Sequence, residues 1–399
     1  MRILHVINSV DPAGGGPIEG VRQLSAVNRS FGHQVEIVSQ DAPECAFLKT
    51  MDIPVHPIGP GSMNYSYNSR LAPWLRANVR NYDIVVVNGI WQYHSFAVWR
   101  VLRDGGSVPY VVFTHGMLDP WFKRTYPLKH LKKMLYWPWG EYRVLRDAGA
   151  VLFTCEEERV LARQSFELYR CTECVVNYGT AGPTGDAKTD LEAFFAAHPE
   201  LRGKRLAIFV GRLHEKKGCD LLLEAFARTL APDPDWHLVM CGPDQVGWKA
   251  KLVEMARRLH LAGRVTWAGM VRGERKWGAL RAAEIFVLPS HQENFGISVA
   301  EALACGTPAL ISNKVNIWRE VEKSGAGIVG EDDLAGTCGL FKCWLETTDA
   351  EKAEFRRRAH ECFLREFEIK QASETLVRTL TNVIEGRSPH AGRNSNVAA

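Results

Sequence analysis

The fold of this chain is decided by one stretch of its sequence, Ile285-Phe286-Val287-Leu288-Pro289-Ser290-His291-Gln292-Glu293-Asn294-Phe295-Gly296-Ile297-Ser298-Val299-Ala300-Glu301. The four apolar residues at its start predict a short buried strand, and the residues from about Gly296 onward predict a helix. Polar side chains fill the loop between the two. A continuous apolar strand that leads through a short loop into a helix is typical of a parallel sheet covered on both faces.

The same alternation of apolar strands and amphipathic stretches runs along the whole chain. The predicted strands of the first half are Arg2–Ile7, Gln34–Ser39, Asp83–Val87, Tyr110–Thr114, Ala150–Phe153 and Cys174–Val176. Those of the second half are Arg205–Val210, His237–Cys241, Arg264–Trp267, Ile285–Leu288 and Pro308–Ile311. The predicted helices include Pro17–Ser30, His94–Arg103, Leu128–Arg146, Asp349–Phe367 and Lys370–Glu385. At helix starts, Thr154 with Glu157 predicts a capping box, and Asp349 predicts an N-cap.

A turn-rich segment at residues 178–190 interrupts the alternation. We therefore predict an α/β chain with an N-terminal domain over residues 1–180, a C-terminal domain over 190–366 and a frayed polar tail at 387–399. Ligands of open parallel sheets bind outside the carboxyl ends of the strands. Two such sheets joined by a hinge are expected to face each other across a cleft.

The composition excludes several classes of protein. Hydrophobic residues make up 46% and charged residues 24% of the 399 residues, which excludes a mostly disordered or fibrous chain. The formal net charge of +4 is too small for a dedicated nucleic-acid binder, and no apolar run reaches the roughly 18–20 residues that cross a bilayer. The start of the chain is too polar for a signal peptide. The ten cysteines are scattered, and the lone Cys171-x-x-Cys174 pair lacks a second pair, so we expect reduced thiols and a cytosolic location.

Three loops after strands of the first half carry candidate binding residues. Gly14-Gly15-Gly16-Pro17 permits close approach of a ligand to the backbone, with Pro17 suited to the first helical position, although a plain tight turn has the same pattern. His115 follows the strand Tyr110–Thr114 and is placed either to bond a substrate or to pack structurally. The residues Asn88-Gly89-Ile90-Trp91-Gln92 follow the preceding strand and form either part of an acceptor pocket or a simple turn.

Two loops of the second half carry charged residues. Arg212 and Lys217, after the strand Arg205–Val210, bring two cations to a strand end, which suits a diphosphate, although solvated surface charge is the common alternative. The order of a P-loop is absent. Glu293 precedes and Glu301 lies within the helix that begins near Gly296, whose N-terminus offers N–H groups to a phosphate. The alternative is an ordinary helix with acidic residues near its positive end.

These motifs together resemble a known family. Glu293 and Glu301, inside E-x-F-G-x-x-x-x-E-A-x-A-x-G-x-P, resemble the signature of the family 4 retaining glycosyltransferases. Gly211-Arg212-Leu213 with Lys217-Gly218, the Gly14–Gly16 loop and His115-Gly116-Met117-Leu118 also match, the last as in bacterial polysaccharide enzymes. The resemblance covers nearly the whole chain and implies the GT-B fold, two Rossmann-like domains with parallel sheets facing an interdomain cleft. It departs at Val176-Asn177-Tyr178-Gly179-Thr180, where relatives often have P-N-G-V-D.

The resemblance also implies roles for individual residues. Catalytic roles fall to His115, facing the reacting sugar, to Glu293, contacting donor hydroxyls, and to Arg212 and Lys217, binding the diphosphate. Glu301 would hold the ribose. The remaining donor contacts are Gly15, Gly16, Gly211, Met270 and Val271 beside the nucleobase, and the backbone of Asn294, Phe295, Gly296, Ile297 and Ser298. The weaker acceptor-binding candidates are Asn88, Trp91, Gln92 and Met117. The final helix, about 368–386, is expected to pack back on the N-terminal, acceptor-binding domain.

The resemblance therefore implies a retaining, metal-independent hexosyltransferase that uses a nucleotide-diphosphate sugar and no cofactor. The expected acceptor is a lipid-linked saccharide of bacterial exopolysaccharide or surface polysaccharide synthesis. No metal is implied, because the only D-x-D, Asp233-Pro234-Asp235, is typical of a turn. Two alternatives are a nucleotide-sugar epimerase or phosphorylase on the same fold, and a non-catalytic nucleotide-sugar-binding protein. The presence of Arg212, Glu301, Glu293 and His115 together favours catalysis.

The segment 121–139 predicts contact with a membrane. It contains basic residues and no acidic one, interleaved with Trp, Tyr and Leu. This combination is typical of a segment that lies in the lipid headgroup layer. We expect a cytoplasmic protein at the inner face of the cell membrane, where this basic segment binds the anionic membrane surface. The alternative is a basic helix whose apolar face packs into the N-terminal core.

Overall fold

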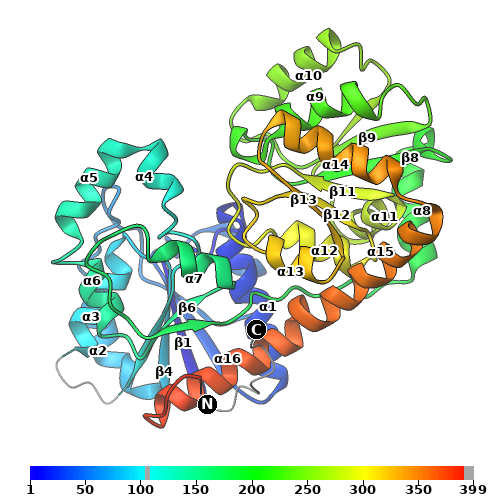
Figure 1. Cartoon of the computed structure of the whole chain (residues 1–399). Helices are drawn as coiled ribbons and strands as arrows, with labels where there is room; N and C mark the ends of the chain where they lie inside the picture. Colours follow the sequence, from blue (N-terminus) through cyan, green and yellow to red (C-terminus); the bar gives the residue numbers. More distant parts are fainter. Residues whose placement is uncertain (104–107, 391–399) are drawn as a thin grey trace. The chain divides into compact units, whose positions relative to one another are not determined.

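In a computed structural model, the chain forms two compact units, and residues 1–103 and 108–390 are described (Figure 1). One unit comprises Met1–Gly179 together with the segment that begins at Ile369, and the other comprises Thr180–Glu368. Of the predicted tail 387–399, residues 391–399 lie outside the described residues. Each unit has its own parallel sheet with helices on both sides (Figure 1).

The first unit is built on a sheet of seven strands in the order β3-β2-β1-β4-β5-β6-β7. The strands are β1 (Arg2–Ile7), β2 (Gln34–Ser39), β3 (Val55–Pro57), β4 (Ile84–Asn88), β5 (Tyr110–Phe113), β6 (Ala150–Phe153) and β7 (Glu173–Val175). The helices are α1 (Gly16–Ser30), α2 (Leu71–Asn78), α3 (Tyr93–Leu102), α4 (Trp121–Thr125), α5 (Pro127–Tyr136), α6 (Glu141–Arg146), α7 (Glu156–Ala162) and α16 (Ile369–Ile384). The central strands β4, β5 and β6 are buried at every position, as a sheet covered on both faces requires.

The second unit repeats the design with six strands in the order β10-β9-β8-β11-β12-β13. The strands are β8 (Arg205–Val210), β9 (Trp236–Cys241), β10 (Val265–Gly269), β11 (Ile285–Leu288), β12 (Ala309–Ser312) and β13 (Gly327–Gly330). The helices are α8 (Ala187–Ala197), α9 (Cys219–Thr229), α10 (Trp248–Arg258), α11 (Gly273–Ala282), α12 (Ile297–Ala304), α13 (Trp318–Lys323), α14 (Leu334–Glu346) and α15 (Asp349–Cys362), followed by a π-helical turn, Phe363–Phe367.

The strand order reverses once in each sheet, and this decides where a ligand binds. In the first unit β1 pairs with β2 on one side and β4 on the other, and in the second unit β8 pairs with β9 and β11. The loops that leave the two central strands diverge at such a point and open a crevice at their carboxyl ends. The predicted α/β class with parallel sheets is confirmed. The loops singled out in the sequence follow β1, β4, β5, β8, β10 and β11, and those after β1, β4, β8 and β11 lie at the reversals or next to them.

The last helix, α16, belongs to the first unit. Its Ser373 hydroxyl donates to Asn28 Oδ1 of α1 at 2.5 Å, and both groups are buried. Thr379 Oγ1 of the same helix lies 3.9 Å from Cys174 Sγ of β7. The chain therefore returns to its first unit after the second unit is complete.

Several predicted element boundaries are wrong, for local reasons. The predicted helix Leu128–Arg146 is two helices, because Pro138 lacks an N–H and the chain bends at Gly140. The N-cap of α7 is Cys155 rather than Thr154, whose N–H and hydroxyl both donate to Glu158 at 2.7 Å.

Two further helix starts differ by one residue. The N-cap of α15 is Thr348 rather than Asp349, and it forms a capping box with Glu351. Pro17 occupies the second position of α1 rather than the first, because the helix begins at Gly16. The strands β3 and β13 were not predicted. Both lie at a sheet edge and carry proline or glycine, which weakens their sequence signal.

Candidate functional site

The site of the second unit lies at its strand-order reversal, where the loops after β8 and β11 are joined. The His291 N–H donates to the Lys216 carbonyl at 2.8 Å, and the Ser290 hydroxyl donates to the same carbonyl at 3.1 Å. Lys216 Nζ in turn donates to Gln292 Oε1 at 3.2 Å. The two predicted motifs, far apart in sequence, therefore form one surface.

Glycines let these loops approach each other closely. A Cβ on Gly218, whose φ is +61°, would lie 2.1 Å from the carbonyl oxygen of Pro289. A Cβ on Gly242 would lie 1.7 Å from the carbonyl oxygen of Gly211. Both distances are far inside van der Waals contact, so only glycine permits the loop geometry that holds Arg212 and Lys217.

The predicted catalytic residues of this unit lie in the same cluster. The Lys217 ammonium forms an ion pair with the Glu293 carboxylate, and both side chains are largely buried. Arg212 Nη1, on the same loop, donates to Gln245 Oε1 at 3.4 Å. Burial and the neighbouring Arg212 and Lys216 cations lower the pKa of Lys217 to about 7. The Glu293 carboxylate opposes that shift, and an anionic ligand would oppose it further.

The helix α12 starts directly after this cluster. Its N-cap is Gly296, which adopts the left-handed conformation with φ +76°. The first turn, with Ile297 and Ser298, therefore points its N–H groups toward the loop that carries Glu293. Such a helix start attracts anions through its N–H groups and its dipole. Gly211, Asn294 and Phe295 belong to the same two loops.

Glu301 lies one turn further along α12 and is buried. Its Oε1 accepts a hydrogen bond from Lys276 Nζ of α11 at 2.6 Å. Sequence reasoning missed Lys276, and nothing in the stretch around it has the spacing of a motif. The pairing arises from the packing of α11 beside α12. A carboxylate held by a lysine is fixed in position.

The predicted nucleobase contacts lie at the edge of the sheet. Met270 and Val271 follow β10, which ends at Gly269 with φ +65°. In the sheet order, β10 is separated from β8 by β9. Met270 is exposed. Both residues leave the same carboxyl edge as the charged cluster, two strands away from it.

In the first unit, the glycine loop after β1 is open. Gly15 is the N-cap of α1 with φ +82°, and a Cβ at Gly14 or Gly15 would meet no atom within 4 Å. Steric crowding therefore does not explain Gly14, but the positive φ does explain Gly15. Gly16 begins a helix of 15 residues, in which the second residue, Pro17, has no N–H to offer a ligand.

His115 and Asn88 meet at the carboxyl ends of β5 and β4. His115 Nε2 lies 3.4 Å from Asn88 Oδ1, while Asn88 Nδ2 donates to His5 Nδ1 at 3.1 Å. His94 Nε2 donates to the Asn88 carbonyl at 3.0 Å. Burial lowers the pKa of His5 and of His94 to about 4 and that of His115 to about 3. The three imidazoles are therefore neutral near pH 7.

His115 also has an uncommon backbone. Its φ is +49° and that of Trp91 is +74°, in the left-handed region that residues other than glycine rarely adopt. Backbone strain of this kind persists where the surrounding structure holds a side chain in a required position, often at a binding site. The imidazole of His115 stacks on the Phe113 ring at 5.4 Å and meets the Tyr178 ring edge-on at 5.5 Å.

The other acceptor candidates fall into two places. Trp91 and Met117 lie together: Trp91 Nε1 donates to the Met117 carbonyl at 3.0 Å, and the Ile90 N–H approaches Met117 Sδ at 3.3 Å. Gln92 instead points to Ser66 Oγ, 3.5 Å away. The buried Glu141 accepts from the Trp91 N–H at 2.9 Å, and burial raises the pKa of Glu141 to about 7. Sequence reasoning missed Glu141, whose α6 position gives no motif.

Two family models match this chain in succession. Residues 15–179 match the family model described as glycosyl transferase 4-like domain, and residues 190–335 match the model described as glycosyl transferases group 1. The two matches follow one another and together cover more than half of the chain. The chain therefore belongs to the group 1 glycosyltransferases.

Curated relatives match only in part. A D-inositol 3-phosphate glycosyltransferase of Geodermatophilus obscurus is 34% identical over 240 residues, which are 55% of this chain and 50% of that protein. A protein of the same name from Mycolicibacterium gilvum is 39% identical over 178 residues, 43% of this chain and 38% of that protein. The chain thus spans half or less of the length of the curated relatives that it matches.

Solved structures match over nearly the whole chain. HepE of Anabaena in complex with UDP has a TM-score of 0.78 at 17% identity, covering 96% of this chain and 100% of that one. Sucrose-phosphate synthase of Thermosynechococcus elongatus has a TM-score of 0.75 at 19% identity, covering 96% and 99%. WaaG, described as a glycosyltransferase involved in lipopolysaccharide biosynthesis, has a TM-score of 0.65 at 16% identity, covering 95% and 99%. These likenesses show the fold, GT-B.

Proposed function

We propose that this glycosyltransferase moves a hexosyl unit from a nucleotide-diphosphate sugar to an acceptor hydroxyl, with retention and without a metal ion. The observation that carries the proposal is the cluster of Arg212, Lys217 and Glu293 at the start of α12. Cations and a helix start at one strand-order reversal are the groups that a sugar diphosphate requires. The second unit would bind the donor and the first unit the acceptor.

The proposed roles follow from the chemistry of the transfer. The bond between the anomeric carbon and the diphosphate oxygen breaks, and its electron pair leaves with the diphosphate. A bond forms between that carbon and the acceptor oxygen, which loses its proton. Arg212 and Lys217 would neutralise the charge that develops on the diphosphate, and preorganised donors of this kind stabilise the transition state most. Glu293 would hold the sugar hydroxyls and Glu301 the ribose.

Structures of similar proteins support the donor class. HepE of Anabaena is described in complexes with UDP and with UDP-glucose. The curated relatives are named for D-inositol 3-phosphate as an acceptor, a phosphate-bearing polyol. WaaG is described as acting in lipopolysaccharide biosynthesis. We favour a lipid-linked saccharide acceptor in bacterial exopolysaccharide or surface polysaccharide synthesis, because the first unit carries an exposed apolar and basic helix.

That helix is α5, in the segment 121–139. Leu128, Leu131 and Leu135 share one face of it and are 78%, 54% and 72% exposed. Lys129 and Lys132 are exposed beside them. Soluble surfaces rarely carry such a stripe without a partner, and basic residues around it complement an anionic bilayer. Among the described residues, no helix has the length and apolar character needed to cross a bilayer. The proposed location is therefore the inner face of the cell membrane, with α5 in the headgroup layer.

The test begins with the donor. Thermal unfolding is measured with UDP-, GDP- and ADP-sugars, because a bound ligand raises the melting temperature in proportion to ln(1 + [L]/Kd). The stabilising sugar is then incubated with and without a lipid-linked acceptor. Transfer that requires the acceptor and keeps the anomeric configuration supports the proposal. Binding without turnover indicates a binding protein, and conversion of the donor without any acceptor alcohol indicates an epimerase.

A further inference from the structure

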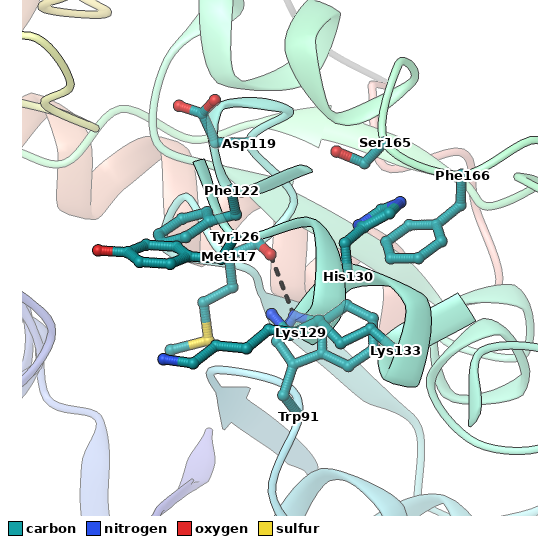
Figure 2. A pocket seen from close by; sticks show the side chains of 10 residues that line it. All are labelled: Trp91, Met117, Asp119, Phe122, Tyr126, Lys129, His130, Lys133, Ser165 and Phe166. Atoms are coloured by element: carbon teal, nitrogen blue, oxygen red, sulfur yellow. Dashed lines mark hydrogen bonds between the residues drawn. The ribbon is translucent and has the colours of Figure 1, made fainter. Parts of the chain in front are cut away.

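A pocket in the first unit lies between α5 and the loop that follows β4 (Figure 2). Its walls are the rings of Trp91, Phe122, Tyr126 and Phe166. Its basic groups are Lys129, His130 and Lys133 of α5, and the lining also includes Asp119, whose Oδ1 accepts from the Trp121 N–H at 2.8 Å. Aromatic walls with cations at one side are suited to a ligand that is anionic at one end and apolar next to it.

The two lysines are held by rings rather than by carboxylates. Lys133 Nζ lies 4.3 Å from the centroid of the Trp91 ring, and Lys129 Nζ lies 4.8 Å from that of Tyr126. Within residues 1–103 and 108–390, neither ammonium lies within 4.0 Å of a carboxylate oxygen. Ring faces attract a cation but do not neutralise its charge. Burial lowers the pKa of Lys133 to about 8, although the Glu141 carboxylate opposes that shift, and a bound anion would oppose it further.

The pocket is rigid before any ligand arrives. The Phe166 ring stacks on the ring of Trp137, with 4.1 Å between their centroids. It also stacks on the imidazole of His130, with 4.9 Å between their centroids. Trp91 is fixed at both ends, because its backbone N–H donates to Glu141 and its indole N–H donates to the Met117 carbonyl. Its positive φ is one more sign that the ring is held where it is. A preformed site loses little entropy on binding.

The apolar face of α5 lies on the other side of this helix. The pocket is lined by Lys129, His130 and Lys133, whereas Leu128, Leu131 and Leu135 are exposed and project about half a turn away around the helix axis. The apolar part of a ligand in the pocket therefore contacts the rings of its walls. Neither a free inorganic anion nor an uncharged amphiphile uses both the cations and the rings.

We propose that this pocket binds the phosphate that links an alkyl or prenyl chain to the acceptor saccharide, with the phosphate against Lys129 and Lys133 and the first carbons of the chain against Trp91 and Phe122. The proposal rests on the function above, since it names the acceptor's anionic group and its place. Trp91 and Met117, expected from the sequence to contact the acceptor, lie at this pocket. The same lysines would also accept the phosphate of a soluble phosphorylated polyol, and the experiment separates the two sources.

The test is isothermal titration of the full chain with three probes: hexyl phosphate, inorganic phosphate and hexyl glucoside. Hexyl phosphate is expected to bind the wild type at least about tenfold more tightly than either other probe, because only it uses both the cations and the rings. Lys133→Ala should weaken hexyl phosphate about tenfold, and Lys133→Arg should restore it. Lys132→Ala is the matched control, a neighbouring lysine that does not line the pocket, and should bind as the wild type does.

Other outcomes overturn the proposal. Equal binding of hexyl phosphate to Lys133→Ala and Lys132→Ala removes the pocket from the interaction. Inorganic phosphate that binds as tightly as hexyl phosphate excludes the alkyl chain and points to a soluble phosphorylated acceptor. Hexyl glucoside that binds as tightly as hexyl phosphate excludes the anionic site.

Failure of the proposed function is distinguishable from failure of the pocket. For each variant, the rise in melting temperature caused by a nucleotide sugar is measured. This rise should equal that of the wild type, because Lys133 lies in the other unit from Lys217. Hexyl phosphate bound through Lys133 in a chain that transfers no sugar contradicts the glycosyltransfer and leaves the pocket assignment standing. Transfer that proceeds with an unchanged acceptor KM in Lys133→Ala overturns the pocket as the acceptor site.

Discussion

The lysines near the strand-order reversals of the two units have different partners. In the second unit, the lysines are paired with carboxylates, Lys217 with Glu293 and Lys276 with Glu301. In the first unit, the groups near the reversal are neutral imidazoles and aromatic rings, and the lysines of α5 rest on ring faces. Under the proposed function, a site whose ligand always brings a diphosphate has its countercharges fixed in place, and a site that also receives an apolar group presents aromatic rings to it.

The largest expected effect tests the charged site. Lys217→Ala should slow turnover by roughly 10²–10³, the loss seen when one preorganised oxyanion donor is removed. The measurement is kcat with a saturating nucleotide sugar. Lys204→Ala is the control, since Lys204 is exposed at the amino end of β8, away from the cluster. Near-normal turnover in Lys217→Ala would remove this residue from the diphosphate site.

The next effect tests the exposed helix of the first unit. Charge reversal at Lys129, Lys132 and Lys133 should abolish sedimentation with anionic liposomes, because each near-surface cation contributes on the order of 1 kcal/mol. Raised salt should release the wild type in the same way. Lys249→Glu with Lys251→Glu and Arg258→Glu reverses three exposed charges on α10 of the other unit and should leave binding intact. Unchanged sedimentation of the folded α5 variant would make this segment ordinary surface.

These two sites also differ in how far the sequence predicts them. The loops after β8 and β11 are contiguous motifs, so the sequence predicts that Arg212, Lys217 and Glu293 follow strands and that a helix starts near Gly296, and the structure has these elements there. Most strands are predicted within a residue or two. The partner of Glu301 was not found, because Lys276 reaches it by helix packing rather than by spacing. The pocket of the first unit is lined by residues from several separate segments between Trp91 and Phe166. Contacts between such distant segments leave no local pattern.

A third prediction uses the neutral histidines of the first unit. His94 has a pKa near 4 in the folded chain and near 6.5 when exposed, so the unfolded state binds more protons between these values. Its contribution to the free energy of unfolding is full above pH 6.5 and is lost as the pH falls toward 4, by about 2 kcal/mol at pH 5.

The comparison is between urea unfolding at pH 7 and pH 5 in the wild type and in His94→Asn. The variant should lose stability less steeply on acidification. The exposed His260→Asn is the control and should follow the wild type. A variant as steep as the wild type would show that His94 is charged, or exposed, in the folded chain.

A smaller effect is expected in the pH dependence of donor binding at Lys217. Burial, Arg212 and Lys216 hold the pKa of Lys217 near 7, so its ammonium deprotonates as the pH rises above that value, while Glu293 resists the loss. The diphosphate of a nucleotide sugar binds the protonated form, and affinity should therefore fall about tenfold between pH 6.5 and 8.5. Lys217→Arg keeps its charge and should flatten the profile. A wild-type profile that is already flat would contradict a titrating Lys217.

The smallest expected effect is that of EDTA, which should leave turnover unchanged. The only D-x-D of the chain, Asp233-Pro234-Asp235, precedes β9 and so lies at the amino ends of the strands, opposite the edge that carries Lys217. Asp233 is already engaged, by Arg205 at 3.4 Å and by the Asp235 N–H at 3.0 Å. At the other edge, Arg212 and Lys217 supply the positive charge that a divalent ion has in other enzymes. Activity lost to EDTA and restored by Mn²⁺ would mean that the diphosphate recruits a cation to this edge, and the two lysine-bearing sites would then differ by a metal as well as by their partners.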